Sequence, residues 1–116
     1  MGMIAITATQ TDALTPPEGS NQLGRAAFFM VDWPDVLVSY FSGYFVSIGS
    51  GKAQFITEVR LQWYDEDIET DVEEGEIVSV DGDEDLTRLA MQMVEEMRIE
   101  FVRSVDMWFP EQYMVY

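Results

Sequence analysis

The sequence contains neither cysteine nor histidine. The absence of cysteine excludes disulfides, thiolate metal sites and thiol nucleophiles, and a reducing compartment is its simplest interpretation. The absence of histidine leaves general acid–base chemistry to carboxylates, tyrosines and the lone Lys52, and it deprives a serine or threonine nucleophile of its commonest base. We therefore expect a protein that is not an enzyme and that uses no cofactor.

Basic residues are also scarce. Six Lys and Arg stand against 22 Asp and Glu, so the formal net charge is -16. A charge of this size repels nucleic acid and anionic membranes and attracts basic surfaces. We expect no direct binding of nucleic acid or membrane, and a basic, nucleic-acid-binding protein or complex as the partner.

Long apolar runs and a basic leader are absent as well. No apolar stretch approaches the roughly 18 residues of a membrane span, and the first ten residues lack the basic region of a secretory signal. These features predict a soluble, cytoplasmic protein, in a bacterial host cell if a phage encodes it. The pattern leaves open whether it is a monomer or a homodimer.

The composition is that of a folded chain. Hydrophobic residues make up 47% of the 116 residues and aromatic residues 13%, more than a disordered acidic chain carries. The length suits one domain of common size. We expect a single domain over residues 1–116, in which residues 1–22 form partly a mobile N-terminal strand and loop.

Periodicity and chain breakers predict an α+β fold, a small antiparallel sheet of about four to five strands packed against a long C-terminal amphipathic helix and one short helix. The predicted elements, in chain order, are a strand over 3–9, a strand over 26–31, a short helix over 33–42, strands over 44–48, 53–64 and 76–80, and a long helix over 84–109.

The two helices rest on different signals. Asp32 occupies an N-cap position and Pro34 follows in the first turn, which favours the short helix, although its β-branched and aromatic content leaves a strand possible. The long helix rests on an apolar stripe at helical spacing and ends before Pro110. The stripe consists of Leu86, Leu89, Ala90, Met93, Met97, Phe101, Val105 and Trp108.

A strongly acidic segment separates the strands from the long helix. Residues 65–85 contain twelve acidic residues and no basic one. Within it, Asp65, Asp67, Glu69, Asp71 and Glu73 alternate, so an extended strand would place them on one face at intervals of about 6.6 to 6.8 Å. Such a row is similar in spacing to consecutive phosphates of a nucleic-acid strand. The opposite face, with Ile68, Thr70 and Val72, is expected to anchor the strand to the core.

We predict that this segment contacts the partner. The predicted contact residues are Asp65, Glu66, Asp67, Glu69, Asp71, Glu73, Glu74, Glu76, Asp81, Asp83, Glu84 and Asp85. Two structural explanations compete with this hypothesis. Charged faces protect sheet edges from aggregation, and acidic residues stabilise helix N-termini.

A calcium loop is a further alternative for the same residues. Counted from Asp65, carboxylates fall at positions 3, 5, 7, 9 and 12 of such a loop. Position 6, however, is Thr70 where the sharp turn requires glycine, and the flanking segments are predicted strands. Weak calcium binding through carboxylate density remains open, without a specific metal site.

In size and charge the chain resembles the small acidic inhibitors with which phages and mobile elements mimic DNA against restriction enzymes, CRISPR effectors or uracil-DNA glycosylase. No motif carries this resemblance. It implies an inhibitor that occupies a cationic nucleic-acid channel and competes with the substrate. The alternative is a non-enzymatic structural or assembly protein whose acidic surface serves solubility or a salty environment.

Overall fold

The structure of the protein is a computed structural model that describes residues 2–12, 16–81 and 85–116. These residues form seven strands and one helix. The strands are β1 (Ile4–Ile6), β2 (Gln10–Thr11), β3 (Gln22–Trp33), β4 (Leu37–Gly49), β5 (Lys52–Trp63), β6 (Glu66–Ser79) and β7 (Tyr113–Val115), and the helix is α1 (Leu86–Trp108).

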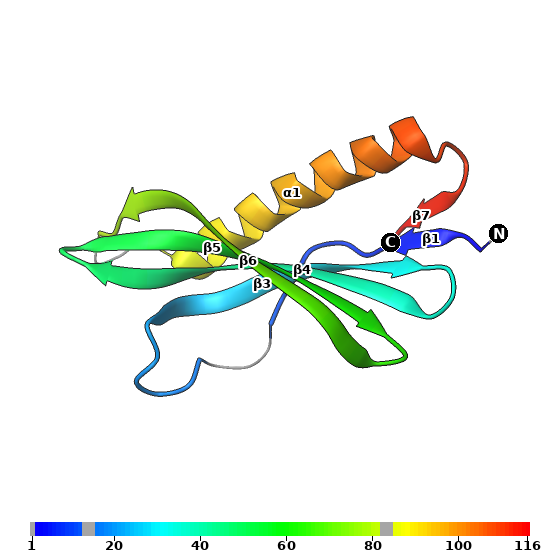
Figure 1. Ribbon diagram of the computed structural model, residues 1–116. Coiled ribbons are helices and arrows are strands. Elements are labelled where there is room, and N and C mark those ends of the chain that lie inside the picture. Colours follow the sequence, from blue (N-terminus) through cyan, green and yellow to red (C-terminus); the bar gives the residue numbers. More distant parts are fainter. Residues whose placement is uncertain (1, 13–15, 82–84) are drawn as a thin grey trace.

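The strands form a single sheet in the order β6-β5-β4-β3-β1-β7, with β2 also paired to β3. The four long strands make an antiparallel meander, whereas β7 runs parallel to β1. The acidic strand β6 and the C-terminal strand β7 therefore lie at opposite edges. Figure 1 shows α1 running along one face of the sheet before the chain returns to β7 beside β1.

The sheet is larger than the predicted sheet of four to five strands, and one of its pairs is parallel. The mixed helix-and-sheet class and the long helix are confirmed, since α1 covers 86–108 against the predicted 84–109. The predicted strands over 26–31 and 44–48 lie within β3 and β4, and the predicted strand over 53–64 lies within β5 except at Tyr64, which belongs to the turn after it.

The predicted short helix over 33–42 is wrong. Residues 34–36 form a turn, in which Asp35 and Val36 have left-handed φ angles of 66° and 61°, and β4 begins at Leu37. The turn is held by the neighbouring hairpin, because the Tyr64 amide donates to the Val36 carbonyl at 3.3 Å and Trp63 Nε1 donates to the Asp35 carbonyl at 3.2 Å. The aromatic and β-branched residues that follow suit a strand buried on one face.

Cross-strand pairing divides the side chains between two faces of the sheet. We call the face that carries Phe29, Phe45 and Phe55 the helix face, because α1 packs on it, chiefly against β3 and β4. On this face the rings of Phe29 and Phe41 stack with their centroids 4.7 Å apart. The ring of Phe101, from α1, packs against both at a tilt. The opposite face, with Phe28, Tyr40 and Glu58, is called the open face.

Gly43 permits the close approach of α1 to the sheet. A Cβ atom at this position would lie 2.7 Å from Val94 Cγ2 of the helix and would also overlap the Phe55 ring. Val94 is fully buried, and Ala90 one turn earlier is buried as well. The helix is thereby centred over β3 and β4, and the middle of β6 remains uncovered on this face.

Candidate functional site

The predicted acidic segment forms the edge strand β6. Of its 14 residues all but one are exposed, on both faces of the sheet. At about 3.3 Å per residue a strand of this length spans about 45 Å. This is close to the longest dimension of the molecule, 50 Å, so the carboxylates extend along most of one edge.

The predicted row of five carboxylates is split by a β-bulge. Gln62 pairs with Asp67 whereas the adjacent Leu61 pairs with Glu69, so Ile68 is an extra residue in β6. Paired residues share a face, and neighbours along β5 alternate. Asp67 consequently lies on the open face and Glu69 on the helix face.

Three members of the predicted row stay together. Glu69, Asp71 and Glu73 pair in turn with Leu61, Val59 and Thr57, all on the helix face. We call these three residues the acidic row. Regular strand geometry spaces their side chains by about 6.6 to 6.8 Å. Glu66, opposite Trp63, continues the row on the same face towards the turn.

The remaining predicted contact residues occupy other positions. Asp65 lies in the β5–β6 turn with a φ of 63°, Glu74 pairs with Ile56 on the open face, and Glu76 lies at a second irregularity of β6. Asp81 is exposed beyond the end of the strand. Asp83 and Glu84 lie outside the described residues.

Asp85 has the kind of structural role that the competing explanation assigns to acidic residues at a helix N-terminus. It is the N-cap of α1, and its Oδ1 accepts a hydrogen bond from the Arg88 amide at 3.2 Å. A cap of this kind satisfies one of the free amides of the first turn and typically contributes about 1 kcal/mol. The competing explanation, helix capping, therefore accounts for this residue.

The predicted anchoring of the strand through Ile68, Thr70 and Val72 is wrong. Ile68 is 55% exposed and Val72 60% exposed, and Thr70 is exposed too. The reason is topological, because β6 is the last strand of the sheet and α1 packs on β3 and β4 instead. The strand is held by its pairing with β5, and only its end reaches the core, through Val78.

Ion pairing leaves the acidic row uncompensated. Within the described part of the chain the ion pairs are Arg60 with Glu58 at 3.0 Å, Arg60 with Asp67 at 4.0 Å, and Arg98 with Glu95. Asp67 is the one member of β6 among them. The row's carboxylates are thus exposed, close to one another and without an intramolecular cation.

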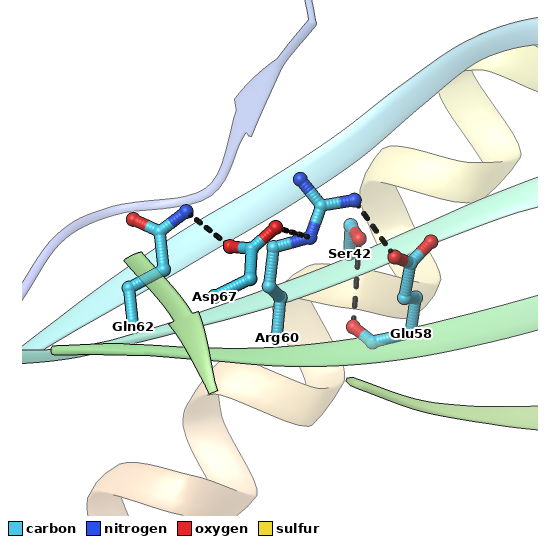
Figure 2. Close-up of polar contacts among 5 residues, drawn as sticks. All are labelled: Ser42, Glu58, Arg60, Gln62 and Asp67. Atoms are coloured by element: carbon cyan, nitrogen blue, oxygen red, sulfur yellow. Dashed lines mark hydrogen bonds and ion pairs between the residues drawn. The ribbon is translucent and has the colours of Figure 1, made fainter. Parts of the chain in front are cut away.

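The open face carries a second polar arrangement, shown in Figure 2. Asp67 lies between Gln62, which donates to it at 2.7 Å, and Arg60, whose other partner is Glu58 Oε1 at 3.0 Å. The Ser42 hydroxyl donates to the Glu58 carbonyl at 3.4 Å. These contacts fix Glu58 in the middle of the face, where its side chain is only 19% exposed.

Around Glu58 the open face is hollowed. A groove of about 450 Å³ is lined by Asp12, Phe28, Tyr40, Ser42, Tyr44 and Glu58, with Arg60 at one end. The register explains the hollow. Ser42 lies between Tyr40 and Tyr44 along β4, and it pairs with Phe28 on one side and Glu58 on the other, so a small side chain is surrounded by larger ones.

The electrostatics of the groove follow from this geometry. Burial, and then the charge of Glu58, raise the pKa of the Tyr44 hydroxyl, so it is neutral at ordinary pH. The hydrogen bond to Glu58, with the charges of Glu58 and Asp67, raises the pKa of Arg60. The groove therefore combines aromatic walls with carboxylates.

The amino-acid pattern alone does not reveal this groove. The alternation of apolar and polar residues along 53–64 predicts that Gln54, Glu58, Arg60 and Gln62 share one face, and the register confirms that prediction. The groove is completed by residues of β3 and β4 and by Asp12, which follows β2, and the predicted helix over 33–42 includes Tyr40. Only the pairing between strands brings them together.

No described set of three or more acidic side chains is arranged to hold a metal ion. The segment proposed for a calcium loop is an extended strand with its side chains on two faces. Among the described residues no helix is both long and apolar enough to cross a membrane.

Comparison with known proteins gives no relative, since no protein-family model, no curated protein and no solved structure matches the chain.

Proposed function

We propose that the protein is an acidic inhibitor that occupies the cationic surface of a nucleic-acid-binding protein and so acts as a nucleic-acid mimic. The observation that carries the proposal is the acidic row on β6, three exposed carboxylates at regular spacing on an uncovered strand edge. Inhibitors of this kind would serve a phage or mobile element against restriction or CRISPR defences.

The unpaired state of the row supports the proposal. Adjacent carboxylates about 6.7 Å apart repel one another by about 0.6 kcal/mol in water, and this repulsion is relieved when a partner supplies cations. Each exposed ion pair formed would contribute about 0.5 to 1 kcal/mol. Three such pairs account for a gain in affinity of about 10-fold to 100-fold.

The arrangement of charge within the fold also supports it. A purely solubilising charge could be spread over the surface, yet nine of the predicted contact residues lie in β6 or the turn and segment that flank it, at one edge of the sheet. Concentration of one sign of charge raises the rate at which an oppositely charged surface is found. The net charge of -16 acts in the same direction.

The proposal is tested by capture from a nuclease-treated bacterial lysate at low salt. The test variant is Glu69→Gln, Asp71→Asn and Glu73→Gln combined, and the control is Glu18→Gln, Glu96→Gln and Glu100→Gln combined. Both triple variants remove three exposed carboxylates and raise the net charge equally.

We expect the wild type and the control to capture the same nucleic-acid-binding protein, which added DNA or RNA releases, and the test variant to lose it. Equal capture by both variants would assign the interaction to bulk charge and would contradict a specific row. Absence of any charge-dependent partner would favour the structural or assembly protein instead.

A further inference from the structure

The groove on the open face has a composition that points to a cation. Three aromatic side chains, Phe28, Tyr40 and Tyr44, stand around the small Ser42, and the described charged residues that line it are Asp12, Glu58 and Arg60. Carboxylates outnumber the cation, and aromatic faces carry negative electrostatic potential. The lining therefore attracts a flat cationic group.

We propose that this groove binds an arginine side chain of the basic partner. The proposal rests on the proposed function for the identity of the partner, and it adds a second, structured contact on the opposite face from the acidic row. A guanidinium group suits the groove because it stacks on aromatic rings and donates to a carboxylate with the same planar group. An ammonium group is more strongly hydrated and gains less from the stacking.

Arg60 shows that a guanidinium group fits beside a carboxylate and an aromatic residue at this site. Its guanidinium donates to Glu58 Oε1 and lies near Asp67, and Tyr40 is its cross-strand partner. On the other side of Glu58 along β5 lies the buried Ile56, which pairs with Tyr44. Arg60 therefore approaches Glu58 from the Tyr40 side, and on the Tyr44 side the neighbouring residue of β5 is apolar.

The same contacts disfavour an anionic ligand. An anion would have to compete with Glu58 and Asp67 for the Arg60 guanidinium. It would also enter a groove whose lining carries more carboxylates than cations. Arg60 is also the more exposed member of its pair, at 46% against 19% for Glu58. We place it at the rim, where it orients Glu58 and leaves the hollow over Ser42 open.

A titration with Nα-acetyl-arginine amide tests the inference with a single cationic group. Two-dimensional NMR at about 0.15 M salt, where exposed charges are screened beyond about 8 Å, follows every backbone amide. We expect saturable shifts confined to Tyr40, Ser42, Tyr44, Glu58 and their neighbours, and weaker binding of Nα-acetyl-lysine amide. Shifts spread along β6, or no saturable shifts, would overturn the proposal.

Charge variants separate a cation site from an anion site. Glu58→Gln is expected to weaken binding of the arginine probe at least about 10-fold, because a charge-assisted hydrogen bond is lost. Arg60→Met is expected to strengthen it about 3-fold, because a competing cation is removed, whereas Arg103→Met, on the exposed surface of α1, leaves it unchanged. Loss of binding in Arg60→Met would overturn the proposal.

Two further variants keep the result interpretable. Tyr44→Leu preserves an apolar wall and is expected to weaken binding about 3-fold to 10-fold through loss of the ring. The acidic-row triple variant is expected to bind the arginine probe like the wild type. If the groove fails this titration while the row variant still loses the captured partner, the groove assignment alone is wrong.

Discussion

Asp67 and Glu69 lie on opposite faces of the sheet although they are two residues apart in one strand. Gln62 pairs with the first and Leu61 with the second, so the bulge at Ile68 reverses the alternation between them. Asp67 is thereby directed to the Arg60 and Gln62 side chains. Glu69 starts a row that continues through Asp71 and Glu73.

This relationship predicts unequal effects of two isosteric changes. Asp71→Asn removes the central charge of the acidic row and is expected to weaken partner binding about 2-fold to 5-fold. Asp67→Asn removes a charge already engaged with Arg60 on the other face, and its effect is expected to be smaller. Dissociation constants of the two single variants provide the comparison, and equal losses would show that the face of the sheet is immaterial.

The close packing of α1 on the sheet predicts that Gly43→Ala is destabilising. The added methyl group would lie 2.7 Å from Val94 Cγ2, so the helix or the Phe55 ring must shift. Overpacking of this kind costs about 1 to 3 kcal/mol. Urea denaturation gives the free energy of unfolding, with Ser104→Ala on the exposed helix surface as a control expected within about 0.5 kcal/mol of wild type. A neutral Gly43→Ala would contradict the observed packing.

Glu95 predicts a pH-dependent contribution to stability. Its carboxylate accepts from Arg98 Nε at 2.9 Å and from the Thr9 hydroxyl at 2.6 Å, which ties the N-terminal segment to α1. The Arg98 hydrogen bond is the main reason that the pKa of Glu95 falls from 4.5 to about 2. Because the folded-state pKa is depressed, the stabilisation is complete above about pH 4.5 and disappears as the pH falls towards 2.

Denaturation of wild type and Glu95→Gln at several pH values measures this contribution. The side chain is 37% exposed, so solvent screening limits the difference to about 1 kcal/mol at neutral pH. We expect the difference to vanish near pH 2. A difference that is constant with pH would mean that the carboxylate charge is not what stabilises the contact.

The exposed position of the acidic strand predicts tolerance of low salt. At about 10 mM ionic strength the Debye length is about 30 Å, so repulsion along β6 is nearly unscreened. The core lies between α1 and β3 to β5, away from most of these charges, so we expect the protein to stay folded. Circular dichroism should show a folded protein under these conditions. Unfolding at low salt would favour the alternative of a protein adapted to a salty environment.

Several elements could be predicted from the sequence because their signals are local. The stripe of α1 repeats at helical spacing. Gly49, Ser50 and Gly51 are typical turn residues that predict a hairpin between the strands over 44–48 and 53–64, and all three have left-handed φ angles in the turn from β4 to β5. Regular alternation likewise gave the two faces of β5. Each of these features depends on residues close together in the chain.

The errors arise where pairing between distant residues decides the outcome. Pro34 and Asp35 suit the start of a helix and a turn equally well. The turn forms because β3 pairs with β4 on either side of it and because the Tyr64 amide donates to it. The bulge at Ile68 leaves no signal in an alternating sequence. The apolar side of β6 suggested burial, but the order of strands placed it at the edge, beyond the reach of α1.

The exposure of the C-terminal aromatic residues also depends on contacts between distant parts of the chain. Trp108 continues the apolar stripe of α1, yet as the last residue of the helix it is 73% exposed. Tyr113 packs against the core through the parallel pairing of β7 with β1. Periodicity gives the face of a helix, whereas the extent of the surface beneath it depends on the whole fold.

Competition with duplex DNA tests the central claim most directly. The captured partner, once purified, is titrated with wild type, the acidic-row triple variant and the control triple variant, each with and without DNA. We predict that DNA and the wild type exclude each other, that the row variant binds about 10-fold to 100-fold more weakly, and that the control binds like the wild type. Simultaneous binding of DNA and protein to the partner would contradict nucleic-acid mimicry.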